Sequence, residues 1–493
     1  MSSIFKHLQQ FFPTDLITLR IIWDKIYSED YLIFLQLGKW ILPNYGGVGK
    51  MFKRIFLGLV MLVIVIISRL DVLAQDKEEI LSLVYERPYP DVKVTRGLKA
   101  TEEVEYTPLF LEEGEFSEKE SKTLGLKANL KGKNKTVSIC YPKVVIKETP
   151  KKEEKELLFL DKFGKVKKRY LLPDWVHIQW SENNKYLCVE KSTYGDYREG
   201  TQRVKRTILD AEGDELWNYE DSPSGGFYVS PTGDYVIETP DCDYGTPDEM
   251  RIHYQTGKYK DITLPSNINS DVDFSENGGY FCVTSGAYLL LFDKHGNELW
   301  RRKGGGFGLE DPYFLKNEFI GAISSRIVGK EDISDFYLYD IKGNLLWKNR
   351  VFLSIQDVYY LESEGKVYVL SGWGHFYLFD IKTGQLLAKY SDENAPGFCP
   401  ASGGIEAPLG ANWRGIIINS KGSEIVTLNL RSIYYEGSTQ RVDIFDKNLN
   451  KIGQKEFPRR YIKINSPYPV IKFSRDNLLA IMTKGGLEIY EVK

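Results

Sequence analysis

Two kinds of paired apolar segment alternate along residues 156–493. In the first kind, an apolar run ends in Asp, a short turn that usually contains Gly follows, and a second run often ends in Trp. Its copies are LFLDKFGKVKK at Leu158, TILDAEGDELW at Thr207, LLFDKHGNELW at Leu290, YLYDIKGNLLW at Tyr337, YLFDIKTGQLLA at Tyr377 and DIFDKNLNKIG at Asp443. Asp accepts backbone hydrogen bonds within a turn and Gly supplies the positive φ of a tight hairpin, so each copy predicts a β-hairpin.

The second kind of unit lies between these hairpins and consists of two apolar runs around a polar turn. Its clear copies are VHIQWSENNKYLCVE at Val176, GFYVSPTGDYVIE at Gly226, DVDFSENGGYFCVT at Asp271, DVYYLESEGKVYVLS at Asp357 and VIKFSRDNLLAIMT at Val470. Divergent copies near Pro312 and Gly415 follow the same pattern. The runs are apolar at nearly every position, so we expect strands that are buried on both faces.

Together the two hairpins form a unit that recurs about every 40 to 50 residues, which is the period of a propeller blade. The sequence therefore predicts an all-β protein, a β-propeller of four-stranded antiparallel blades. Seven inner hairpins favour seven blades, and TVSICYPKVVIKE at Thr136 would make eight as one more inner hairpin. The final GLEIYEVK stops after one strand of an outer hairpin, so we expect the N-terminal side to supply the strand that covers its open edge.

Two repeat sequences carry a family resemblance. LFDKHGNELW and LYDIKGNLLW resemble the repeat of pyrroloquinoline-quinone-type propellers, and FSENGGYFCV and VSPTGDYVIE resemble the inner hairpins of WD-repeat and related bacterial propellers. The resemblance covers residues 156–493 and implies an architecture, because this fold serves many functions. A quinone site in that family typically includes an adjacent Cys pair, and no Cys-Cys occurs here. We therefore expect no cofactor.

The chain before the repeats contains the layout of a secretory signal at residues 51–74. Lys53 and Arg54 precede an apolar run over residues 55–67, and Val72-Leu73-Ala74 provides a cleavage site before Gln75. The apolar run is shorter than the roughly 18 residues that a membrane-spanning helix needs, which favours a cleaved signal. The alternative is an uncleaved membrane anchor through residues 55–67.

Residues 1–50 precede this signal, although a signal belongs at the N-terminus of a chain. Gly codons begin with GG, so Gly46 and Gly47 match a ribosome-binding sequence just upstream of Met51. We interpret residues 1–50 as an extension assigned in error, or else as a membrane-proximal helix over residues 16–42. Residues 75–155 are dense in charge (DKEE, EEGEFSEKESK, ETPKKEEKE) and predict a charged linker with strand pieces.

Composition and short motifs narrow the classes of function that the chain can have. The net charge of −3 and the pI near 6.1 argue against a nucleic-acid binder. The five cysteines are far apart and odd in number, which predicts buried thiols without a disulfide framework. No two histidines have the spacing of zinc ligands, and no nucleophile motif is present.

Two connections contain candidate binding residues. PDCDYGTPDEM at Pro240 concentrates carboxylates that make a weak candidate for a metal site: Asp241, Asp243, Asp248 and Glu249. Their spacing matches no standard calcium loop, so a plain acidic connection is favoured. The segment SDENAPGFCPASGGIEAPLGANWRG at Ser391 lengthens one repeat and contains candidate partner-binding residues in Phe398, Trp413 and Arg414, unless these pack the loop onto the ring.

These observations predict an exported, non-catalytic monomer that acts as a binding or scaffold module in the cell envelope. Its location would be the periplasm, the cell surface or the exterior, and its partner a protein, peptide or glycan. The alternative is an enzyme, either a divergent quinoprotein-like oxidoreductase or a hydrolase with a site at the central channel.

Overall fold

The computed structural model divides the chain into two units, Met1–Asp76 and Lys77–Lys493. All described residues lie in the second unit: 81–88, 105–124, 136–148, 154–173, 176–194, 203–221, 226–239, 249–265, 271–304, 308–328, 331–352, 355–371, 374–392, 413–419, 421–430, 439–458, 471–482 and 486–492. The predicted extension at 1–50 and the signal at 51–74 lie outside them. No helix in the described ranges is long and apolar enough to cross a membrane.

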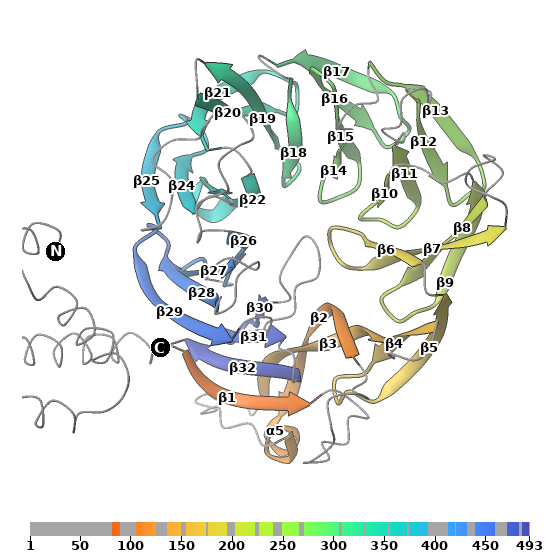
Figure 1. The fold of residues 1–493 in the computed structure, drawn as a ribbon, viewed down its shortest axis with the longest axis vertical. Coiled ribbons are helices and arrows are strands. Elements are labelled where there is room, and N and C mark those ends of the chain that lie inside the picture. Colours follow the sequence, from red (N-terminus) through yellow and green to blue (C-terminus); the bar gives the residue numbers. More distant parts are fainter. Residues whose placement is uncertain are drawn as a thin grey trace, which may run out of the picture. The chain divides into compact units, whose positions relative to one another are not determined.

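Eight four-stranded antiparallel sheets are arranged as the blades of a ring (Figure 1). The first four blades follow the chain: blade 1 has β2 (Glu105–Ser117), β3 (Thr136–Glu148), β4 (Glu154–Leu160) and β5 (Val166–Pro173); blade 2 has β6 (Val176–Trp180), β7 (Tyr186–Tyr194), β8 (Arg203–Asp210) and β9 (Glu215–Asp221); blade 3 has β10 (Gly226–Val229), β11 (Tyr235–Thr239), β12 (Glu249–Tyr254) and β13 (Tyr259–Thr263); blade 4 has β14 (Val272–Phe274), β15 (Tyr280–Ser285), β16 (Tyr288–Asp293) and β17 (Glu298–Lys303).

The other four blades continue in order: blade 5 has β18 (Glu310–Leu315), β19 (Phe319–Val328), β20 (Glu331–Asp340) and β21 (Leu345–Val351); blade 6 has β22 (Ile355–Leu361), β23 (Lys366–Ser371), β24 (His375–Asp380) and β25 (Leu386–Ser391); blade 7 has β26 (Trp413–Ile418), β27 (Glu424–Leu430), β28 (Thr439–Asp446) and β29 (Lys451–Pro458); blade 8 has β30 (Ile471–Phe473), β31 (Leu478–Met482), β32 (Gly486–Val492) and β1 (Leu81–Pro88). Within the described ranges, two short helices, α5 (Glu118–Leu124) and η2 (Glu362–Glu364), lie between strands.

The β-propeller is confirmed, but the favoured number of seven blades is wrong and the alternative of eight is correct. The eighth sheet is blade 1, whose outer hairpin is the Asp161 repeat. The segment at Thr136 is not a hairpin but the single strand β3. Its partner strand β2 precedes it in the sequence, and α5 and residues 125–135 separate the two. Residues 75–155 thus include β1, β2, α5, β3 and the start of β4.

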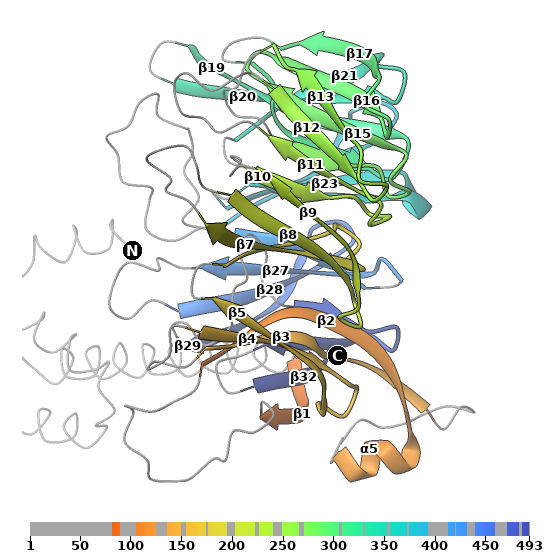
Figure 2. The same ribbon diagram turned by 90° about the vertical axis from the view of Figure 1, so that its right-hand side faces the viewer.

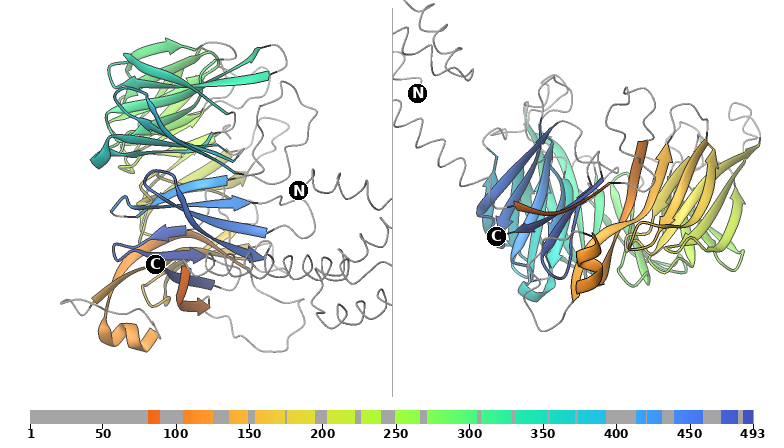
Figure 3. Two further views of the ribbon diagram at one scale, coloured as in Figure 1. Left: turned by 90° about the vertical axis from the view of Figure 1, so that its left-hand side faces the viewer. Right: turned by 90° about the horizontal axis from the view of Figure 1, so that it is seen from below.

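The ring closes through blade 8, which combines the two ends of the described chain. Strand β1 pairs antiparallel with β32, from Leu81 opposite Val492 to Pro88 opposite Gly486, and lies beside the C-terminal strands in the views of Figures 1 and 3. The expected supply of a strand from the N-terminal side is confirmed. The strand comes from the segment before the Asp161 hairpin and covers the edge that β32 would otherwise expose.

The outer hairpins follow the turn chemistry that the sequence predicts. In blade 4, Oδ1 of Asp293 accepts hydrogen bonds from the backbone N–H groups of His295 and Asn297, both at 2.9 Å. Gly296 adopts the positive φ of 72° that this turn requires. In blade 7 the same position is Leu449, also at positive φ, so the turn geometry is retained where the sequence lacks Gly.

Neighbouring blades are joined by apolar packing and by the tryptophans of the outer hairpins. Each indole Nε1 donates a hydrogen bond to a backbone oxygen of the next blade: Trp217 to Gly233 at 2.8 Å, Trp300 to Ile341 at 3.0 Å and Trp347 to Ile381 at 2.8 Å. The apolar body of each ring is buried between the sheets. One side chain thus both fills the interface and fixes how the next blade docks.

The antiparallel order gives the ring two different faces, seen edge-on in Figure 2. We call the face that carries the turns within the inner and outer hairpins the turn face. We call the other the connection face, because strands 2 and 3 of each blade and successive blades are joined there. Hairpins on the turn face are short except for the first of blade 1, which contains α5. On the connection face the links range from residues 286–287 to residues 392–412.

We predict that deleting residues 487–493 destabilises the whole ring. The deletion removes Leu487, Ile489 and Tyr490, each at most 2% exposed, and leaves β1 without a partner. The melting temperature and solubility of the truncated chain should both fall, whereas removal of Lys493 alone should leave both unchanged. A soluble truncation that melts within about 1 °C of the full chain would contradict closure through β32.

Candidate functional site

The described candidate residues of the sequence analysis lie at the starts of two strands, directly after links of the connection face. Glu249 begins β12 and is exposed, while Asp241, Asp243 and Asp248 lie outside the described residues. Trp413 and Arg414 begin β26, the first strand of blade 7, with Asn429 and Leu428 as their backbone partners. Phe398 also lies outside the described ranges. Both the weak metal site and the partner-binding group therefore stay predictions.

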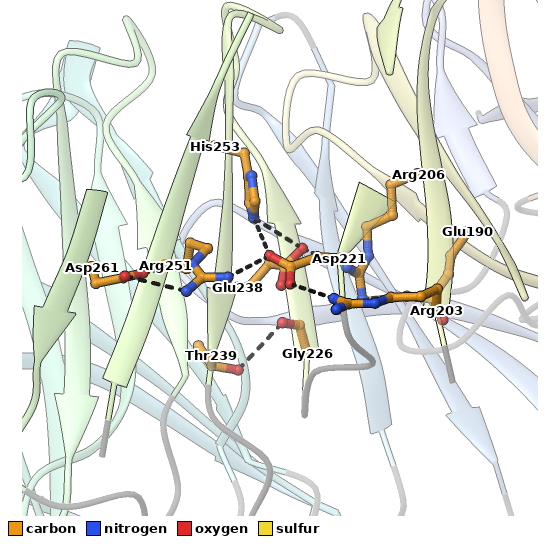
Figure 4. Close-up of polar contacts among 10 residues, drawn as sticks. All are labelled: Glu190, Arg203, Arg206, Asp221, Gly226, Glu238, Thr239, Arg251, His253 and Asp261. Atoms are coloured by element: carbon orange, nitrogen blue, oxygen red, sulfur yellow. Dashed lines mark hydrogen bonds and ion pairs between the residues drawn. The ribbon is translucent and has the colours of Figure 1, made fainter. Parts of the chain in front are cut away.

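A polar cluster with a buried centre and an exposed margin lies at the interface of blades 2 and 3, near the connection face (Figure 4). We call it the blade 2–3 cluster, and its members are Glu190, Arg203, Arg206, Asp221, Glu238, Arg251, His253 and Asp261. Strand alternation places these residues. Ile208 of β8 packs with Val236 of β11 in the apolar interface, so Arg206 and Glu238, two residues along each strand, face the same interface.

Arg206 is the centre of the cluster and is fully buried. Its guanidinium donates to the carboxylates of Glu190 in blade 2 and Glu238 in blade 3, and it lies 5.0 Å from the ring centroid of Phe227. Burial alone would lower the pKa of Arg206, but the carboxylate of Glu238 and, less strongly, that of Glu190 raise it above its ordinary value. The guanidinium therefore stays charged and links two blades.

His253 of β12 points toward two carboxylates. Its Nε2 lies 3.0 Å from Oδ2 of Asp221 and 3.5 Å from Oε1 of Glu238. The imidazole is stacked on Tyr219, with ring centroids 4.0 Å apart, which holds its orientation. Arg251 donates to Oδ2 of Asp221 at 2.7 Å. Within the described ranges, the possible metal-ligand atoms of Asp221, Glu238 and His253 all lie within 4.8 Å of one another, so this group could hold a metal ion.

Burial raises the pKa of Glu238 and of Tyr219, which lies beside the cluster. The pKa of Glu238 rises because burial disfavours its charged form, although Arg206 and His253 oppose the shift. The pKa of the Tyr219 hydroxyl also rises, chiefly through burial and then through the nearby Glu238 carboxylate. Both groups lie in a medium of low polarity, where an unbalanced charge is costly.

A second buried polar cluster lies between blades 6 and 7. We call it the blade 6–7 cluster, and its members are Asp392, Arg441, Asp443 and Lys451. Arg441 lies 2.5 Å from Asp392 and 2.8 Å from Asp443, and Lys451 lies 2.6 Å from Asp443. Two carboxylates thus face two cations. The two clusters share one feature: an Asp at or directly after the end of a blade's fourth strand, Asp221 or Asp392, pairs with an Arg of the next blade.

Two aspartates on first strands tie neighbouring blades at the inner rim of the ring. Asp273 of β14 accepts hydrogen bonds from the N–H groups of Phe274 and of Phe314 in blade 5. Asp357 of β22 accepts from the N–H groups of Val358 at 2.8 Å and of Ile416, in blade 7, at 2.7 Å. Burial raises the pKa of each carboxyl to about 7, although these hydrogen bonds favour the charged form.

The cysteines agree with the sequence analysis where they are described. Cys140, Cys188 and Cys282 are free and buried, and burial raises the pKa of Cys140 to about 12, so this thiol is unreactive. Cys242 and Cys399 lie outside the described residues. The buried thiols belong to the packing of the blades.

Sequence reasoning missed the blade 2–3 cluster. Asp221, Glu238 and His253 lie on three separate strands, so no short motif joins them, and the search for zinc ligands considered only the spacing between histidines. A signal was nevertheless present. Charged residues occur inside strands that are otherwise apolar, as Arg206 does in RVKRTILD and Glu238 in YVIET, and such residues are rarely buried without a partner.

Comparison with known proteins concerns the architecture. No protein-family model matches the sequence, and no curated protein matches it either. Among solved structures, the chain is similar to the C-terminal WD40 domain of Sif2, with a TM-score of 0.46 and 11% identity over 71% of this chain and 93% of that one. It is also similar to BamB from Moraxella catarrhalis, with a TM-score of 0.43 and 14% identity over 71% and 94%.

We predict that Arg206→Met destabilises the protein by about 3–5 kcal/mol, because it leaves the buried Glu238 and the partly buried Glu190 without this cation. The matched control is Arg301→Met. Arg301 pairs with Glu298 at 2.7 Å but its side chain is 43% exposed, so its loss should cost about 1 kcal/mol or less. Denaturant unfolding of both variants measures the difference, and equal costs would mean that the blade 2–3 cluster is not a buried ion-pair network.

We predict that Asp273 and Asp357 make stability depend on pH. Their pKa is raised to about 7 in the folded protein, so the fold retains protons that the unfolded chain releases near pH 4. The contribution of the two carboxyls to the unfolding free energy therefore falls as the pH rises from about 4 to about 7 and is constant above that range. The unfolding free energy of the Asp273→Asn/Asp357→Asn variant, relative to wild type, should therefore shift in the variant's favour over this interval. A constant difference would contradict the raised pKa values.

Proposed function

We propose that this chain is an exported, non-catalytic β-propeller that binds a protein, peptide or glycan in the cell envelope through its connection face. The observation that carries the proposal is the difference between the two faces. On the turn face the Asp side chains are hydrogen-bonded within their own turns, as at Asp293 and Asp340. On the connection face the links differ in length from blade to blade, which is the pattern of a scaffold that presents binding loops.

The longest link contains the side chains best suited to recognition. Residues 392–412 join β25 to β26, and connections of this length are usually functional or disordered. Phe398 lies within this link, and Trp413 and Arg414 follow it directly at the start of β26. Aromatic rings and guanidinium groups supply most of the binding energy at protein interfaces, so these three residues are the proposed anchors.

Export rests on the sequence of residues 51–74. The short basic segment, the apolar run over residues 55–67 and the small residues before Gln75 support transport across a membrane. The protein would then act in the periplasm, at the cell surface or outside the cell. An anchor through residues 55–67 would hold the propeller at the membrane.

A non-catalytic role is supported by the use of the buried charges. Arg206 and Arg441 each pair with carboxylates of the adjoining blade, so these groups serve the assembly of the ring.

The alternative, a quinoprotein-like oxidoreductase or a hydrolase at the central channel, is favoured by one observation. Asp273 and Asp357 lie at the inner rim with a pKa of about 7, and such shifted carboxyls are common in active sites. Burial of both carboxyls between blades is a structural reason for the same raised pKa values.

We predict that Phe398→Ala and the Trp413→Ala/Arg414→Ala variant capture less partner from native envelope extract than the wild-type chain does. Loss of a central aromatic or Arg anchor typically weakens binding by about 2 kcal/mol or more. The measurement is quantitative capture on the immobilised propeller, with partners identified by mass spectrometry. Melting temperatures are measured alongside, so that a folding defect is recognised.

The matched control is His295→Ala, which changes an exposed residue of the turn face and should leave capture unchanged. Full capture by the connection-face variants together with loss in His295→Ala would place binding on the turn face instead. A saturable rise in melting temperature on adding pyrroloquinoline quinone with calcium would favour the enzymatic alternative.

A further inference from the structure

We propose that Asp221, Glu238 and His253 bind a divalent transition-metal ion at the interface of blades 2 and 3, with zinc as the probe. The three side chains come from the end of β9, from β11 and from β12, so the ion would join two blades. All three are buried, and their ligand atoms converge on one point between the sheets (Figure 4). The inference does not depend on the proposed binding function.

The distances fit a tetrahedral zinc site. Zinc binds imidazole nitrogen and carboxylate oxygen at about 2.0–2.2 Å, which places neighbouring ligand atoms of a tetrahedron about 3.3 Å apart. Nε2 of His253 lies 3.0 Å from Oδ2 of Asp221 and 3.5 Å from Oε1 of Glu238, on either side of that value. Small side-chain movements would therefore suffice to admit the ion.

The state of His253 also indicates a ligand. The residue is 7% exposed, and its Nε2 makes no hydrogen bond of regular geometry within the described part of the chain, although two carboxylates lie near it. Stacking on Tyr219 fixes the ring so that Nε2 is directed at the gap between those carboxylates. A metal ion in this gap would accept the imidazole lone pair and bind an oxygen of each carboxylate.

The two clusters differ in their balance of acidic and cationic side chains. In the blade 2–3 cluster the carboxylates belong to Glu190, Asp221, Glu238 and Asp261, and the guanidinium groups to Arg203, Arg206 and Arg251. The named acids outnumber the named guanidinium groups by one, whereas the blade 6–7 cluster has two acids and two cations. A bound cation would add positive charge beside these acids, and the guanidinium groups would act as hydrogen-bond donors that orient the ligating carboxylates.

Zinc binding to the full chain tests whether the three side chains hold an ion. The full chain is stripped of metal with a chelator, and zinc binding is followed by calorimetry and by the melting temperature. We expect saturable binding of about one ion per chain and a higher melting temperature. His253→Gln keeps a polar side chain of similar reach and should weaken binding by more than about 10-fold.

Two controls and a second readout accompany this test. His295→Gln removes an exposed histidine, and Asp392→Asn alters the blade 6–7 cluster; neither should change the zinc affinity. Cobalt added to the unmodified chain should give the intense visible absorption of a four-coordinate site, which needs no variant to fold. Absence of saturable zinc binding, equal affinity in wild type and His253→Gln, or a cobalt spectrum of the hydrated ion alone would each overturn the proposal.

Discussion

The structure depends on the pairing of β1 with β32. Eight sheets that are apolar on both faces cannot end, because a terminal blade would expose one whole face and the backbone groups of its outermost edge. Blade 8 solves this by taking three strands from the C-terminal end and one from residues 81–88. The strand that completes the ring is therefore the first of the described chain, and ring closure is a contact of very high sequence separation.

Within the ring, each interface between blades must also specify its neighbour, because eight similar sheets could stack in several ways. Apolar packing is non-directional, whereas the indole bonds of Trp217, Trp300 and Trp347 and the inner-rim bonds of Asp273 and Asp357 have defined partners. Two interfaces additionally bury charge. A buried ion pair contributes little net stability compared with apolar packing, so we infer that Arg206 and Arg441 serve chiefly to select the adjoining blade.

The regular part of this fold could be predicted from sequence because its signals are local. The Asp-Gly hairpins and the apolar runs identify seven blades, and each of these signals is made by residues close together in the sequence. The inner hairpin of blade 1 was predicted only as the alternative, because β2 and β3 are separated by α5 and residues 125–135, and the charge of EEGEFSEKESK hides the end of β2. The blade 2–3 cluster escaped for the opposite reason. It is made by residues far apart in sequence that only the docking of two sheets brings together.

The position of that cluster connects the interior of the ring with the face proposed to bind. Glu238 and His253 lie on β11 and β12, and residues 240–248 join these two strands, so both ends of this acidic link start beside the cluster. Asp221 likewise ends β9, where the chain leaves blade 2 for blade 3. A metal ion bound between the blades would alter the attraction between strands that carry these links. Binding at the connection face and the electrostatics of the interior would then be coupled through the ends of the same strands.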